Sequence, residues 1–155
     1  MSLAASLCYD HEVLRGKLAT LESFLPSLVV APFTLSRLTE SLATCLRGHT
    51  EREERLLDTL MRQQDEPPLA LIQQLHDEHE NQRTRLAILH ELLTHPEPAS
   101  EEQILTQASY LVKDLREHMA MEERHIFPII DIDGEGVGEV TTAVDDEAVE
   151  TLGLA

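Results

Sequence analysis

Two sequence elements place a glutamate four residues after a histidine: Glu53 follows His49, and Glu122 follows His118. In an α-helix this spacing puts both side chains on one face, one turn apart, where an imidazole and a carboxylate can reach the same metal ion. Both pairs lie on apolar helical stripes, at positions where leucine would be expected. Because a polar group in a protein core is costly unless it is paired, this pattern indicates metal binding.

Two further histidines, His11 and His79, lie on the apolar stripes of two other predicted helices. With a rise of about 1.5 Å per residue, the distances of these residues from the connecting loops place them at similar heights in an antiparallel bundle. A lone histidine on such a stripe is usually an ordinary core residue, but four at one height favour a metal site. We therefore expect six side chains to converge on one level of one core: His11, His49, Glu53, His79, His118 and Glu122.

Leucine periodicity and prolines mark the helices that must position these side chains. We predict helices over about residues 6–25, 34–62, 68–94 and 100–127, with Ser100 as an N-cap and Pro128 as the end of the fourth helix. The apolar connector at residues 27–33 is expected to pack against the helices. Short connectors indicate an all-α, up-down-up-down four-helix bundle over residues 1–130. Residues 131–155 are expected to form an acidic tail, flexible or folded into a short helix.

The composition excludes several classes of function. The formal net charge is −17, and the segment after Ile130 holds eight acidic residues with no Lys or Arg. Such a charge argues against binding to nucleic acid or to an anionic membrane surface. No apolar run approaches the length of a membrane span, the N-terminus does not resemble a signal peptide, and two cysteines are too few for a disulfide scaffold. We expect a cytoplasmic protein, for which a homodimer is compatible with the sequence.

The number and type of candidate ligands suggest the metal. Four imidazoles and two carboxylates suit two ions that are bridged by the carboxylates, and bundle cores host such dinuclear sites. Nitrogen and oxygen donors without a thiolate favour iron or manganese, with zinc as a further option.

The same residues resemble those of the hemerythrin-like family, also called HHE cation-binding domains. The matching pieces are DHEVL around His11, HTEREE from His49, DEHE around His79 and HMAMEERHIFP from His118, and they cover about residues 6–130. The resemblance implies a four-helix bundle that holds two non-haem iron ions. It also implies that the four histidines are terminal ligands and that Glu53 and Glu122 bridge the two ions.

The chain departs from the oxygen-carrying hemerythrins at two positions. Those proteins have a second histidine four residues from the first on the third helix, where this chain has Leu75; His76 is the candidate for a fifth imidazole. They also use a carboxylate five residues after the histidine of the fourth helix. That position is Glu123 here, whereas Glu122 fits the H-x-x-x-E form. Both differences argue against simple reversible oxygen carriage.

The function that we expect is binding or sensing of O₂, NO or a related oxidant such as peroxide at a carboxylate-bridged di-iron centre. Two alternatives remain open at this point. One is a di-iron enzyme, namely an oxidase, a peroxide or NO scavenger, or a protein of iron–sulfur cluster repair. The other is a regulatory module whose fold depends on iron. The sequence does not decide between binding and catalysis.

Overall fold

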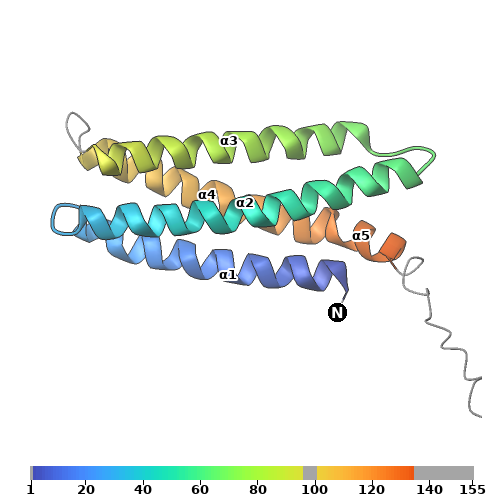
Figure 1. The fold of residues 1–155 in the computed structure, drawn as a ribbon, viewed down its shortest axis with the longest axis horizontal. Coiled ribbons are helices and arrows are strands. Elements are labelled where there is room, and N and C mark those ends of the chain that lie inside the picture. Colours follow the sequence, from blue (N-terminus) through green and yellow to red (C-terminus); the bar gives the residue numbers. More distant parts are fainter. Residues whose placement is uncertain (1, 96–100, 135–155) are drawn as a thin grey trace, which may run out of the picture.

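The computed structural model describes residues 2–95 and 101–134. In this part of the chain, four long helices run alternately up and down along a common axis (Figure 1). They are α1 (Leu3–Phe24), α2 (Pro32–Gln63), α3 (Leu69–Thr94) and α4 (Glu101–His125), with the 3₁₀ turn η1 (Leu25–Ser27) after α1 and the short helix α5 (Phe127–Gly134) after α4. The predicted all-α four-helix bundle is confirmed. Among these helices, none combines the length and apolar character needed to span a membrane.

Local sequence signals account for the helix starts. The Ser2 side chain caps α1 by accepting a hydrogen bond from the backbone N–H of Ala5 at 3.1 Å. Helix α2 begins at Pro32, and Pro68 directly precedes α3. Proline suits the first turn of a helix because the missing N–H would have no partner there. The predicted N-cap at Ser100 and the predicted tail at residues 135–155 lie outside the described residues.

The fourth helix ends two residues before the predicted boundary at Phe127, and a short helix that the sequence analysis did not predict follows it. Helix α4 ends at His125, and the chain re-forms a helix from Phe127 with Pro128 in its first turn. The N–H of Ile126 still donates to Glu122 at 2.8 Å, and the N–H of Ile130 donates to Ile126 at 3.2 Å. The proline therefore separates two helices, because it cannot continue α4 but is well placed at the start of α5.

The core consists of two apolar clusters, one on each side of the level of the candidate metal ligands. The larger cluster contains Leu14, Leu18, Leu42, Leu86 and Leu115 and extends to the end of the bundle where α1 connects to α2. The smaller one lies at the other end and contains Ala4, Leu7, Leu57, Leu75, Ile126, Phe127 and Ile130. A polar layer is thus enclosed between two apolar layers.

The apolar connector between α1 and α2 is less buried than predicted. Leu28 is 5% exposed, whereas Val29, Val30 and Phe33 are 75%, 87% and 75% exposed. The chain reverses within a few residues, with the N–H of Ala31 bonded to the carbonyl of Ser27 at 2.8 Å. Such a tight turn directs one side chain inward and leaves the others facing solvent.

Leu18 should be a major contributor to the stability of the larger cluster because it is fully buried. Replacing Leu18 by Ala removes buried apolar surface and leaves a cavity, so we expect a loss of about 2–5 kcal/mol in the free energy of unfolding. Urea unfolding of the metal-free protein measures this change. Val30→Ala is the matched control and should change stability by less than about 0.5 kcal/mol; similar values for both variants would contradict this account of the core.

Candidate metal centre

The six candidate ligands lie together in the polar layer of the bundle. Each is at most 7% exposed although all are polar, and they come from four different helices. The one-turn spacing within α2 and within α4 directs a histidine and a glutamate of the same helix toward the bundle axis. The residues are His11 from α1, His49 and Glu53 from α2, His79 from α3, and His118 and Glu122 from α4.

The carboxylate of Glu122 lies between two pairs of histidines. The Nε2 atoms of His11 and His49 are 3.1 Å apart and lie 3.0 and 3.9 Å from Oε2 of Glu122. The Nε2 atoms of His79 and His118 are also 3.1 Å apart and lie 3.4 and 2.5 Å from Oε1. Each pair therefore forms, with one oxygen of the same carboxylate, a group of three atoms that could hold one cation. The two groups share Glu122, which is the arrangement of a dimetal site.

Glu53 supplies a second carboxylate at the junction of the two groups. Its Oε2 lies 3.5 Å from Nε2 of His49 and 3.6 Å from Nε2 of His79, so it faces one histidine of each group. Neither of its oxygens has a hydrogen-bond partner in the described part of the chain. Burial, together with the charge of Glu122, raises the pKa of Glu53 to about 10. A buried carboxylate of this kind is costly without a counter-charge, and a bound cation would supply one.

The histidines lower the pKa of the other buried carboxylate, Glu122, and so oppose the effect of burial. Burial alone would raise the pKa of Glu122, but its interactions with the four histidines of the site outweigh burial and hold that pKa well below its usual range. Burial likewise acts to lower the pKa of His118, and its interactions with Glu122 and Glu78 outweigh this effect and raise it. Glu122 is therefore ionised among the four imidazoles, whereas Glu53 retains its proton at neutral pH, and a bound cation would take the place of that proton.

Four outer carboxylates fix the orientation of the four histidines. In each ring the Nδ1 atom faces a carboxylate from another helix: Glu123 for His11 at 2.9 Å, Asp10 for His49 at 3.3 Å, Glu54 for His79 at 3.0 Å and Glu78 for His118 at 2.6 Å. An Nδ1–H that donates to a carboxylate leaves the lone pair of Nε2 directed at the centre, as metal binding requires. Each helix supplies one outer carboxylate to the next, so the contacts form a closed ring around the bundle.

Sequence analysis did not identify this ring as a set. The usable signal is that every outer carboxylate directly adjoins a core ligand in the chain, as in Asp10-His11, Glu53-Glu54, Glu78-His79 and Glu122-Glu123. Three of the four also contact an arginine: Arg15 lies 2.8 Å from Glu123, Arg52 lies 2.6 Å from Asp10 and Arg83 lies 3.7 Å from Glu54. The hydrogen bond from Arg15 is the main cause of the lowered pKa of Glu123. The cation of Arg15 thus favours the ionised form of Glu123.

The structure also places the two residues whose roles the sequence left undecided. His76 is 35% exposed and directs its ring nitrogens at Glu54, at 3.4 Å, and at Asp58, at 4.0 Å. It belongs to neither of the two groups found among the described residues. Glu122, and not Glu123, lies at the centre, because Glu123 turns outward to His11 and Arg15.

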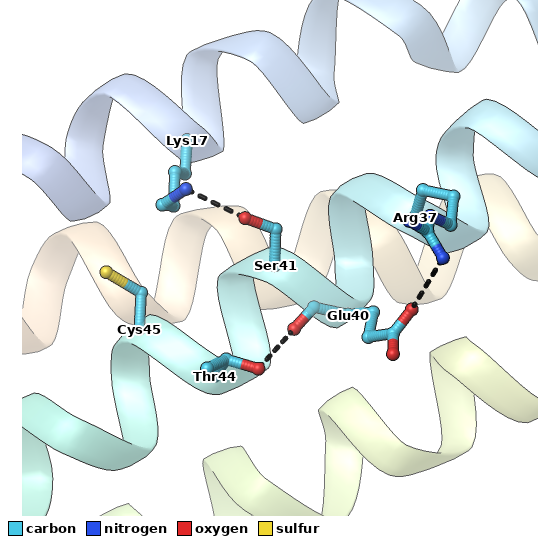
Figure 2. A pocket seen from close by; sticks show the side chains of 6 residues that line it. All are labelled: Lys17, Arg37, Glu40, Ser41, Thr44 and Cys45. Atoms are coloured by element: carbon cyan, nitrogen blue, oxygen red, sulfur yellow. Dashed lines mark hydrogen bonds and ion pairs between the residues drawn. The ribbon is translucent and has the colours of Figure 1, made fainter.

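A groove of about 410 Å³ lies on the outer surface between α1 and α2 (Figure 2). Five of its six lining side chains are already paired with one another or with nearby backbone: Lys17 donates to Oγ of Ser41 at 2.8 Å, Thr44 donates to the carbonyl of Glu40 at 3.1 Å, and Arg37 lies 4.0 Å from Glu40. None of the six candidate ligands lines this groove. The chemistry that the structure supports is therefore in the buried layer.

Comparison with known families agrees with this geometry. A family model described as "Hemerythrin HHE cation binding domain" matches residues 4–130, and a second, overlapping match covers residues 70–154. The first match includes all six candidate ligands and all four outer carboxylates. No curated protein and no solved structure matches the chain at the threshold of the comparison.

Glu53→Gln should stabilise the metal-free protein at neutral pH. The pKa of Glu53 is about 10 in the folded chain, above the ordinary value of 4.5. The folded state therefore favours the protonated carboxyl, and this contribution to stability is fully present below pH 4.5 and declines as the pH rises toward 10, because the unfolded chain ionises first. Glutamine does not ionise, and at pH 7 we expect a gain on the order of 1–3 kcal/mol. Urea unfolding at pH 5 and pH 8 measures this, with Glu51→Gln on the exposed face of α2 as the control. An unchanged pH dependence in Glu53→Gln would contradict the assignment.

Glu78→Ala should weaken metal binding without removing a ligand. The loss of the contact to Nδ1 of His118 frees that ring to rotate, and we expect metal affinity to fall about 10- to 100-fold. Competition with a chelator of known affinity measures the change. Glu117→Ala is the control, since Glu117 is exposed and faces Lys113. Equal affinity in both variants would show that the outer carboxylate does not support the site.

Proposed function

Because this chain belongs to the hemerythrin HHE cation-binding family, we propose that it is a non-haem di-iron protein that binds or senses O₂, NO or a related oxidant such as peroxide. The observation that carries the proposal is the pair of His-His-Glu groups that share Glu122. Glu122 would bridge the two ions, with one oxygen directed at each pair of histidines. Glu53 would form the second bridge.

The donor set supports iron. Each group offers two imidazole nitrogens and one carboxylate oxygen, with no thiolate among the donors. Two histidines and one carboxylate around a metal with open positions are characteristic of non-haem iron sites that react with oxygen. Manganese and zinc also accept nitrogen and oxygen donors, so the identity of the metal is part of the proposal.

The number of donors supports the binding of a small ligand. Each ion would receive two imidazole nitrogens and an oxygen from Glu122, and Oε2 of Glu53 faces one histidine of each group. At most four protein donors per ion leave room for an external ligand, and iron with an open position binds O₂, NO and peroxide. The protein would contribute a fixed set of donors and two apolar layers that restrict access of water.

Metal analysis and absorption spectroscopy test the proposal together. After anaerobic loading we expect about two iron ions per chain, with absorption bands that change when O₂ or NO is admitted. His118→Ala removes one imidazole of the site and should reduce the iron content, whereas His125→Ala, on the exposed side of α4, should not.

The possible results separate the alternatives. Absence of iron uptake, or full occupancy in His118→Ala, would contradict the proposal. Rapid turnover of peroxide or NO by the loaded protein would favour the enzyme among the alternatives.

A further inference from the structure

Gln82 is a buried polar residue that the site as described does not use. It is 1% exposed, and neither its amide nitrogen nor its amide oxygen has a hydrogen-bond partner in the described residues. Leaving such a group unsatisfied costs about 1–3 kcal/mol. Thr39, another buried polar residue outside the six ligands, shows the usual solution, because its hydroxyl donates to the carbonyl of Leu35 at 2.9 Å. The described part of the chain supplies no partner for the amide of Gln82, which indicates a partner such as a bound ligand.

The position of Gln82 points to the metal centre. It lies three residues after His79 on the buried face of α3, about 4.5 Å further along the helix. Side chains of a helix lean toward its N-terminus, so the amide leans toward the turn that carries His79. Gln82 thus borders the polar layer on the side of the larger apolar cluster.

The other three helices have leucine at the corresponding height. The residue one turn from the centre in the same direction is Leu14 in α1, Leu46 in α2 and Leu115 in α4, and all three are buried in the larger cluster. At this height three helices carry leucine and one carries an amide, so the two ligand groups have different surroundings. The His79–His118 group has a hydrogen-bonding side chain beside it, and the His11–His49 group has none at this height.

We propose that Gln82 contacts the external ligand of the centre. Its amide N–H donates a hydrogen bond to an oxygen or nitrogen atom of a small polar ligand, which is thereby held beside the His79–His118 group. This role rests on the proposed function, and it adds the side on which the ligand binds and the residue that orients it. The amide oxygen can accept a hydrogen bond from the same ligand when that ligand is protonated.

Azide, a small anion with nitrogen acceptors at both ends, is the probe for this role. Azide is titrated into the iron-loaded full chain, and binding is followed by absorption. Gln82→Met has nearly the same length and lacks both amide atoms, and Gln82→Leu is a second variant that makes the layer uniform. Gln73→Leu, on the exposed face of α3, is the matched control.

We expect the iron content of both Gln82 variants to equal that of the wild type, while azide affinity falls about three- to tenfold, as the loss of one hydrogen bond predicts. The metal-free variants should unfold at a higher urea concentration than the wild type, because the unsatisfied amide is gone. Wild-type azide affinity in a Gln82 variant with full iron content would overturn the role of Gln82 alone. A wild-type protein that takes up iron but binds no azide would likewise overturn the role of Gln82 alone, whereas a wild-type protein that takes up no iron would overturn both this role and the proposed function.

Discussion

The structure depends on the burial of two carboxylates in an apolar core. Glu53 and Glu122 are both fully buried, and the leucine-rich clusters on either side of them offer no polar compensation. A buried negative charge is costly unless it is paired. Four imidazoles surround Glu122 and lower its pKa, whereas Glu53 remains without a hydrogen-bond partner in the described residues and its pKa rises to about 10. The remaining imbalance is what two cations would correct, because they would bind both carboxylates and take the place of the proton on Glu53.

This requirement extends outward from the core to the surface. The histidines can present Nε2 to a cation only when Nδ1 carries the proton, and the four outer carboxylates accept that proton's hydrogen bond. Three of these carboxylates are in turn paired with arginines at the surface. Because each outer carboxylate comes from a different helix than the histidine it contacts, the orientation of the ligands depends on the packing of the whole bundle. The core, the ligand shell and the surface charge are thus parts of one arrangement.

Much of the fold and of the centre could be predicted from the sequence, because both follow helical periodicity. The buried residues of α3, from Ile72 to Leu93, recur at steps of three and four residues along the chain. Counting residues from the connectors was sufficient to place His11 and His79 at the height of the other ligands. Helical periodicity alone could not predict which histidine each outer carboxylate contacts. A residue that adjoins a ligand in the chain points about 100° away from it around the helix, so its partner depends on how the helices are rotated against one another. Asp10, for example, adjoins His11 but contacts His49. The same holds for the unsatisfied amide of Gln82, which sequence periodicity identifies only as a core position.

A crystal structure of the iron-loaded protein, with anomalous scattering recorded at the iron absorption edge, would test the central claim most directly. The account predicts two anomalous peaks per chain, one on each side of the Glu122 carboxylate, with the first beside Nε2 of His11 and His49 and the second beside Nε2 of His79 and His118. It also predicts that the Glu53 carboxylate contacts both peaks. A single peak, a peak outside the layer of these six residues, or no peak would contradict the interpretation of this core as a dimetal centre.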